Sequence, residues 1–288
     1  MSTVPAFLHG LVADAAVFPP GDVPLDEAVR RHREHRAAPY ADLVGPLVVG
    51  DAHLPDLTDL TEPLGATVVV SGGAGALEPA ARWARRTEHL RLHGLQIALR
   101  DSATGESAQN ARRLTAALDV LVADGLLDEG AEVHIETPRV YDAEPSRDWL
   151  AALDEIAAGD HGLKLRTGGP DADAVPTSSE LAACIGAALD RELRFTCTAG
   201  LHHAVRHRDP DSGVAQHGFL NVLLATRASL DGAGSSDVAA VLEETDPAAL
   251  LGSTDEAGLV GARRWFTRFG SCSVLEPLED LRALGLLP

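Results

Sequence analysis

The stretch His161-Gly-Leu-Lys-Leu-Arg-Thr-Gly-Gly169 alternates apolar and basic side chains and then runs into a pair of glycines. This period of two is typical of a β-strand, in which successive side chains point to opposite faces of a sheet. Leu163 and Leu165 share one face, which leaves Lys164 and Arg166 on the other. The pattern predicts a short buried strand that ends in a glycine-rich loop.

Similar apolar segments recur along the chain and alternate with helical patterns, which is typical of a parallel sheet or barrel. Strands are predicted over Leu8–Ala13, Gly45–Val49, Ala66–Val70, Leu92–Leu99, Glu132–Glu136, Gly162–Arg166, Arg194–Thr198 and Trp265–Ser271. Helices are predicted over Leu25–Arg36, Leu54–Leu64, Leu77–Arg86, Ala108–Asp124, Arg147–Ala158, Ser178–Leu189 and Leu278–Leu286, with two or more in the interval 217–262.

Strands that alternate with helices in this way favour an α/β fold of the (β/α)8 TIM-barrel type, whose active site lies at the C-terminal ends of the strands. An open doubly wound sheet is the competing architecture, but no G-x-G-x-x-G motif follows the first strand. No domain boundary is evident, so residues 1–288 are expected to form a single TIM-barrel domain. The long interval between the seventh and eighth strands predicts extra helices there.

The chain has 288 residues, of which 45% are hydrophobic, and a formal net charge of −19. Such acidity argues against nucleic acid or an anionic membrane as a partner, because both attract a basic surface. No apolar run is long enough for a membrane-spanning helix and the N-terminus lacks the basic start of a secretory signal, so we expect a cytoplasmic protein. The three cysteines have no C-x-x-C spacing, which suggests neither a disulfide framework nor a cysteine zinc site.

Lys164 is the single lysine among 24 basic residues. Burial can lower the pKa of a lysine amine and free it as a Schiff-base nucleophile, whereas a guanidinium stays protonated. The alternative is that arginine use is a compositional bias and that Lys164 survived by chance on the surface.

Alternation within the neighbouring strands predicts which side chains accompany Lys164 inside the barrel. In Val133-His-Ile-Glu-Thr137 the polar face carries His134 and Glu136, and in the seventh strand Thr196 and Thr198 point inward. A carboxylate beside a latent nucleophile offers a proton acceptor, so the candidate catalytic residues are Lys164, Glu136 and His134. The alternative is a structural ion pair between glutamate and lysine or arginine within the barrel.

The order of four motifs resembles strands five to eight of the deoxyribose-phosphate aldolase type of class I aldolase. The motifs are Val133-His-Ile-Glu-Thr137, Gly162-Leu-Lys-Leu-Arg-Thr-Gly168, Phe195-Thr-Cys-Thr-Ala-Gly-Leu201 and Arg268-Phe-Gly-Ser-Cys-Ser273. The resemblance implies a TIM barrel in which the strand-six lysine, here Lys164, forms the Schiff base. It also implies that the loops after strands seven and eight, here Ala199-Gly200 and Gly270-Ser271, bind a substrate phosphate. The family's second lysine falls at Thr196, and its strand-four aspartate has no obvious counterpart.

Four histidines follow the seventh strand, at His202, His203, His207 and His217. Neutral imidazoles together with a carboxylate could bind a divalent metal ion, which would make the site a metal-dependent lyase or isomerase. The same residues could instead bind a phosphate or carboxylate together with nearby arginines, or lie in a solvated loop.

The sequence therefore predicts a class I aldolase-like lyase in which Lys164 forms an imine with a small carbonyl substrate. The substrate-binding candidates are Arg166, Thr196, Thr198, Gly200, His202, His203, Gly270 and Ser271. No cofactor is expected, and the partner is a small carbonyl or phosphate-bearing molecule; a homo-oligomer is compatible with the sequence. Two alternatives remain, the metal-dependent enzyme and a non-catalytic barrel that binds a small anionic metabolite.

Overall fold

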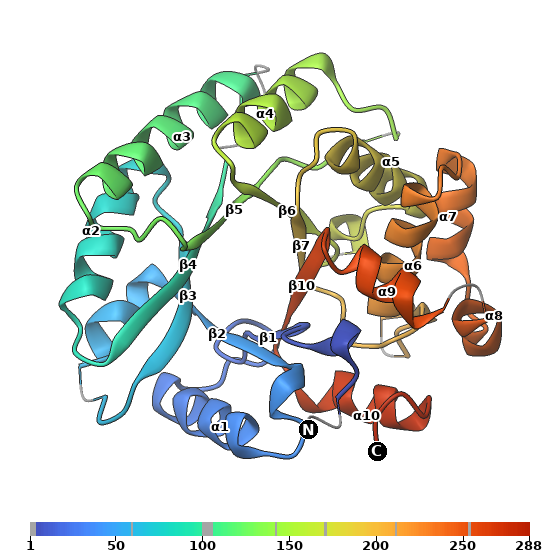
Figure 1. Cartoon of the computed structure of the whole chain (residues 1–288), viewed down its shortest axis with the longest axis horizontal. Helices are drawn as coiled ribbons and strands as arrows, with labels where there is room; N and C mark the ends of the chain where they lie inside the picture. The colour runs from blue at the N-terminus through green and yellow to red at the C-terminus, as the bar shows by residue number, and fades with distance from the viewer. Residues whose placement is uncertain are drawn as a thin grey trace.

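Eight parallel strands close into a barrel, and helices surround it on the outside (Figure 1). The structure is a computed structural model that describes residues 4–58, 60–99, 106–141, 143–169, 172–210, 212–252 and 255–288. Neighbouring barrel strands follow the order β1-β10-β7-β6-β5-β4-β3-β2, and every pairing is parallel. The chain is thus a (β/α)8 TIM barrel, as the alternation of strands and helices predicts.

The barrel strands are β1 Val12–Asp14, β2 Val44–Gly50, β3 Leu64–Val70, β4 Leu90–Ala98, β5 Glu132–Glu136, β6 Gly162–Arg166, β7 Phe195–Thr198 and β10 Phe266–Ser271. A separate small hairpin pairs β8 His207–Arg208 with β9 Ala215–Gln216. The helices are α1 Leu25–Ala37, α2 Ala74–Arg86, α3 Ser107–Ala123, α4 Arg147–Ala158, α5 Ser178–Leu189, α6 Phe219–Leu230, α7 Ser235–Glu243, α8 Pro247–Leu251, α9 Glu256–Ala262 and α10 Leu275–Ala283. Short 3-10 helices span Ala6–Leu8, Ala41–Leu43, Asp51–Asp56 and Ala172–Ala174.

One predicted strand has the wrong bounds, and one predicted helix differs in type and extent. The first strand was expected at Leu8–Ala13, but Ala6–Leu8 forms a 3-10 turn and Gly10 takes a φ of 61°, so the strand begins only at Val12. The positive φ at Gly10 breaks extended backbone before the barrel wall is reached. For the helix expected over Leu54–Leu64, the residues that the structure describes form only the 3-10 turn over Asp51–Asp56, and β3 already starts at Leu64.

The extra helices predicted between the seventh and eighth strands are present as α6 to α9. Helix α6 is buried over Phe219–Thr226, because it packs against β10 on one side and against α5, α7 and α9 on the others. A helix that is covered in this way needs apolar residues around most of its circumference. Its Phe219 ring stacks on Phe269 of β10, with ring centroids 4.9 Å apart.

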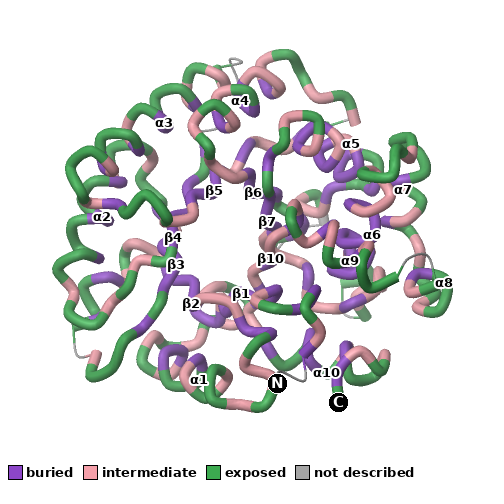
Figure 2. Tube along the Cα trace, in the orientation of Figure 1, coloured by how far each residue is buried: buried purple, intermediate pink, exposed green. Residues whose placement is uncertain are grey.

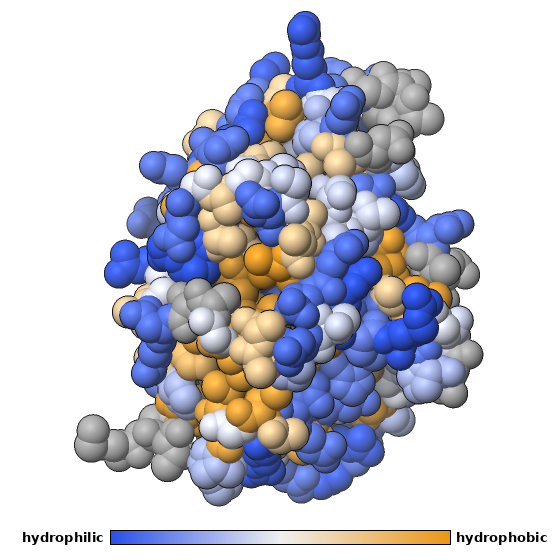
Figure 3. All heavy atoms as spheres, turned by 90° about the vertical axis from the view of Figure 1, so that its right-hand side faces the viewer, coloured by the Kyte–Doolittle hydropathy of each residue, from blue (hydrophilic) through white to orange (hydrophobic). Residues whose placement is uncertain are grey.

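Buried residues concentrate where the strands face the ring of helices (Figure 2). Alternate residues such as Leu163 and Leu165 of β6 fill this layer, which leaves Lys164 and Arg166 for the barrel interior. The space-filling view over the α7 and α8 side shows hydrophilic side chains around smaller hydrophobic areas (Figure 3). Within the described part of the chain, none of the helices has the length and apolar character needed to cross a bilayer.

Candidate active site

Lys164 lies in the middle of β6 and is only 5% exposed. In the register of the barrel it stands between Glu136 of β5 and Thr196 of β7. Its Nζ lies 3.1 Å from Glu136 Oε2, so the amine and the carboxylate are in direct contact. The inward cluster predicted from strand alternation is therefore formed.

Glu136 contacts a second cation, because its Oε1 accepts a hydrogen bond of 2.8 Å from Arg166 Nε. Burial by itself raises the pKa of Glu136, but Lys164 and Arg166 more than offset it and hold that pKa below its usual range. Burial lowers the pKa of Lys164, and the Glu136 carboxylate opposes this shift without cancelling it. The amine thus gives up its proton more readily than an exposed lysine while a proton acceptor lies beside it.

The C-terminal end of the barrel is open above Lys164. Arg166 and Ala98 end their strands on the interior side, and both are exposed. Gly50 of β2, Thr198 of β7 and Gly270 of β10 lie at the same end of the barrel, are half-buried, and have short or no side chains. A small molecule can therefore approach the amine from the C-terminal side.

A pocket of about 330 Å³ borders this opening. Ala98, Glu136 and Arg166 line it from the interior side of the strands, whereas Leu99, Leu165 and residues of α5 line it from the helix side. The pocket therefore passes over the ends of β4, β5 and β6 towards α5. Its further lining is largely apolar and includes Pro138, Val140, Tyr141, Pro176, Leu181 and Cys184.

Arg139 closes the outer part of this larger pocket. Its guanidinium donates to Glu180 with Nη2 2.6 Å from Oε2 and to the carbonyl oxygen of Asp173, and it lies 5.0 Å from the centre of the Tyr141 ring. These contacts connect the loop after β5 with α5 and with the segment before it. They hold together the outer wall of the larger pocket, which these segments form.

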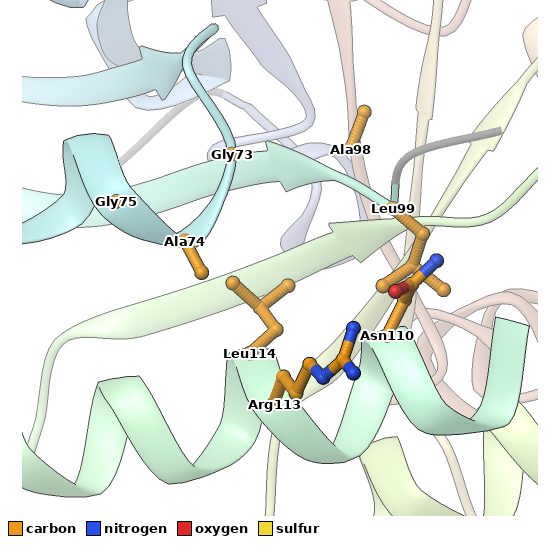
Figure 4. A pocket seen from close by; sticks show the side chains of 8 residues that line it. All are labelled: Gly73, Ala74, Gly75, Ala98, Leu99, Asn110, Arg113 and Leu114. Atoms are coloured by element: carbon orange, nitrogen blue, oxygen red, sulfur yellow. The ribbon is translucent and has the colours of Figure 1, made fainter. Parts of the chain in front are cut away.

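A second, smaller pocket of about 210 Å³ lies beside the first, at the start of α2 (Figure 4). Asn110 and Arg113 extend from α3 towards it, and it shares Ala98 and Leu99 with the larger pocket. Neither Lys164 nor Glu136 lines the smaller pocket, and of the two only Glu136 lines the larger one. We therefore assign the larger pocket, which Glu136 borders, to the candidate active site.

His134, a candidate catalytic residue, lies one inward position below Glu136, towards the N-terminal end of the barrel. It is 5% exposed, and its ring packs so closely on Gly162 that a Cβ there would lie 2.6 Å from Cδ2. Burial and the nearby Arg268, Lys164 and Arg194 lower its pKa to about 3, so the ring is neutral. The structure thus places His134 beneath the lysine rather than at the opening, beside an ion pair in which Arg268 Nη1 lies 2.8 Å from Glu132 Oε2.

The two threonines predicted to bind substrate lie at different depths in the barrel. Thr196 is 1% exposed and its hydroxyl donates to the carbonyl oxygen of Arg268 at 2.7 Å, so it lies inside the barrel wall beside Lys164. Thr198 ends β7 at the opening, and its Oγ1 would lie 3.8 Å from a Cβ at Gly270. Thr198 and Gly270 are therefore together at the rim where a substrate would enter.

The remaining loop candidates have structural contacts. Gly200 has a φ of 77°, and a Cβ there would lie 3.0 Å from the carbonyl oxygen of Thr167. The absence of a side chain lets the loops after β6 and β7 touch. Ser271 is 2% exposed, and its hydroxyl donates to the carbonyl oxygen of Ser273 at 2.7 Å.

The histidines after β7 are divided among different partners. His202 Nδ1 lies 2.8 Å from Glu276 Oε2, and His203 Nδ1 lies 3.1 Å from Asp280 Oδ2. His217 is fully buried, donates from Nε2 to the carbonyl oxygen of Pro176 and receives a hydrogen bond from Arg206 at Nδ1. Among the residues that the structure describes, no three or more His, Cys, Asp or Glu side chains converge as they would around a metal ion.

The sequence did not indicate which side chains contact Cys272 near the opening. Cys272, directly after β10, lies with Sγ 3.8 Å from Nδ1 and 3.9 Å from Nε2 of His202. The carboxylates of Glu276 and Asp280 come from α10, which the sequence marked only as a closing helix. No local signal could have paired a cysteine with a histidine 70 positions away.

Comparisons with known proteins supply no relative for this chain. No family model matches the sequence, and neither a curated protein nor a solved structure matches it significantly.

Proposed function

We propose that this chain is a class I aldolase-like lyase in which Lys164 forms an imine with a small carbonyl substrate. The observation that carries the proposal is the contact of 3.1 Å between the single lysine and Glu136 below the open end of a TIM barrel. A buried amine with a lowered pKa and an adjacent carboxylate has the nucleophile and the proton acceptor that imine formation requires.

In the proposed reaction, Glu136 takes a proton from the Lys164 ammonium, and the neutral amine attacks the substrate carbonyl carbon. The carbinolamine then loses its hydroxyl as water, with the proton returned from Glu136, and an iminium ion remains on Nζ. The substrate hydroxyl on the leaving carbon then gives its proton to Glu136 while the iminium accepts the electron pair of the carbon–carbon bond that breaks, which gives an enamine and a second carbonyl product. Protonation of the enamine carbon and hydrolysis of the imine release the first product and restore the lysine.

Arg166 is the candidate for binding an anionic group of the substrate. Its side chain is 51% exposed at the opening, and one of its nitrogens already holds Glu136. A guanidinium presents several N–H donors in a plane, so it can hold Glu136 and still bind a carboxylate or phosphate. The larger pocket beyond it offers space for an apolar part of the substrate.

Reductive trapping tests the proposal. The protein is incubated with aldehydes, keto acids and sugar phosphates, reduced with borohydride, and analysed by intact-mass spectrometry and peptide mapping. An imine that is reduced leaves the mass of the carbonyl compound minus water plus two hydrogens on the peptide that contains Lys164. Peptide mapping separates this adduct from modification of the N-terminal amine.

Two variants serve as controls. Lys164→Arg retains the charge and removes the amine, so the adduct should disappear. Adding Arg82→Lys to that variant restores one lysine on the outside of α2, where Arg82 pairs with Glu78 on the surface. If this relocated lysine is trapped as efficiently as Lys164, the barrel does not activate its lysine, and the proposal is wrong.

A further inference from the structure

A cysteine, a histidine and a glutamate lie in contact at the rim of the barrel, between the ends of β7 and β10. Cys272 follows β10 directly, His202 lies in the loop after β7, and Glu276 belongs to the first turn of α10. Cys272 Sγ lies almost equally far from the two ring nitrogens of His202, 3.8 Å from Nδ1 and 3.9 Å from Nε2, and His202 Nδ1 is 2.8 Å from Glu276 Oε2. This is a separate cluster from Lys164 and Glu136, and the proposed lyase reaction does not use it.

The hydrogen-bond chemistry orients the imidazole. An ionised carboxylate only accepts hydrogen bonds, so His202 Nδ1 carries the proton that Glu276 receives. The neutral ring then has its lone pair on Nε2, within reach of the Cys272 thiol. A nucleophile, a base and a group that orients the base are thereby present together.

The surroundings of Cys272 differ from those of the other two cysteines. Cys184 and Cys197 are buried at 8% and 1% exposure, and burial raises the pKa of Cys184 to about 12. Cys272 is only partly buried, and its neighbour His202 has a side chain that is 21% exposed, so a reagent can reach the thiol.

Cys272 needs a neighbouring base in order to react as a nucleophile. Burial raises the pKa of Cys272, and the carboxylates of Glu276 and of Asp22 in the loop after β1 act in the same direction. Hydrogen bonds at the backbone of Gly21 and of Cys272 itself oppose the shift. The resting thiol is therefore protonated, and its reaction requires that a neighbouring group take the proton during attack.

We propose that Cys272 is a nucleophilic thiol that reacts with small disulfides, with His202 as its general base and Glu276 as the residue that positions His202. Cys272 Sγ forms a bond to one sulfur of the disulfide while the bond between the two disulfide sulfurs breaks. The electron pair of that bond leaves with the second sulfur as a thiolate. The proton of Cys272 passes to His202 Nε2 and then to the departing thiolate, so a mixed disulfide and one free thiol result.

The test uses the neutral disulfide dithiodipyridine on the folded full chain, because a neutral reagent is not repelled by a net charge of −19. We expect one thiol to react in a fast phase, and Cys272→Ser to abolish that phase. His202→Gln should lower its rate constant at neutral pH by about tenfold or more, as expected when a general base is lost. All three thiols should react after denaturation of the wild type, which confirms the total count.

The positioning role of Glu276 is tested through the pH profile. Glu276→Gln should shift the pH dependence of the fast phase, whereas Glu279→Gln, which removes an exposed carboxylate from the same helix, should leave it unchanged. The proposal is overturned if no fast phase depends on Cys272, or if His202→Gln leaves both the rate constant and its pH profile unchanged. Circular dichroism spectra that match the wild type establish that each variant is folded.

Discussion

The Nζ atom of Lys164 and Oε2 of Glu136 lie 3.1 Å apart across neighbouring strands of the barrel, and each residue contributes to the ionisation of the other. A buried cation is tolerated in such a position because its counter-ion is buried with it. This contact gives the first prediction, which concerns stability.

Glu136→Gln should destabilise the protein by about 3 kcal/mol near neutral pH, the lower end of what is expected when one partner of a buried ion pair is removed. This difference in the free energy of unfolding should shrink as the pH rises towards 10.5. Without Glu136 the buried Lys164 is pushed to give up its proton on folding, and that cost disappears once the lysine of the unfolded state is itself deprotonated. Urea unfolding at several pH values measures both effects. The double variant Lys164→Met with Glu136→Gln should be more stable than Glu136→Gln alone, and equal or lower stability would contradict this account of the pair.

The free energy of unfolding at acidic pH should depend on His217. Burial lowers its folded pKa to about 4, from a value of 6.5 in the absence of the fold, so the unfolded state binds more protons between these values. The contribution of His217 to stability is therefore complete above pH 6.5 and falls as the pH drops towards 4. At pH 5 the loss amounts to about 2 kcal/mol, given about 1.4 kcal/mol per unit.

The matched variant is His217→Gln, which keeps a hydrogen-bonding side chain without a proton that titrates in this range. Its free energy of unfolding should be lower than that of the wild type at pH 7.5 but should change less between pH 7.5 and pH 5. An equal pH dependence in both proteins would show that His217 is not held neutral by the fold.

Gly200→Ala should destabilise the protein by about 1–3 kcal/mol, because the residue has a φ of 77° and a new Cβ would meet the Thr167 carbonyl oxygen at 3.0 Å. Thermal unfolding measures the loss. Gly125→Ala is the comparison, since Gly125 also has a positive φ but no atom near its Cβ position, so it isolates the conformational strain from the contact. A smaller effect at Gly200 than at Gly125 would contradict the close approach of the two loops.

The larger pocket should select carbonyl substrates by their apolar part. Cys184→Leu adds apolar volume to the pocket from α5 and should reduce borohydride trapping of a six-carbon or aromatic aldehyde relative to acetaldehyde. Cys184→Ala removes volume from the same position and should retain the wild-type preference. If Cys184→Leu lowers trapping of all aldehydes equally, the pocket does not hold the substrate.

Most of the fold could be predicted because each barrel strand carries its own pattern. Glu132–Glu136 and Gly162–Arg166 have the predicted bounds, since apolar side chains face the helices and polar ones face the interior. The predicted start of the first strand is wrong because Leu8 is as apolar as a strand residue but is buried from a 3-10 turn. An apolar segment indicates that its residues are buried, but it does not show whether the backbone is a β-strand or a 3-10 turn.

The site could be predicted only in part. The alternation of side chains on the two adjacent strands was sufficient to predict that Glu136 and Lys164 lie close together. Both face the barrel interior, and the parallel pairing places them side by side. The alternation could not show that His134 is only 5% exposed, since burial depends on how the strands and their side chains pack around the ring. The contact of Cys272 with His202 depends on two loops that leave different strands, and neither loop has a sequence period.

The titration of Lys164 itself tests the central claim most directly. Because the chain has one lysine, labelling lysine with carbon-13 at Cε gives a single side-chain signal whose chemical shift reports the charge on Nζ. We predict a midpoint below 10.5 in the folded protein, a still lower midpoint in Glu136→Gln, and a new imine signal when a reactive carbonyl compound is added. A midpoint at or above 10.5, with no change of the signal in the presence of carbonyl compounds that react with free amines, would contradict the account.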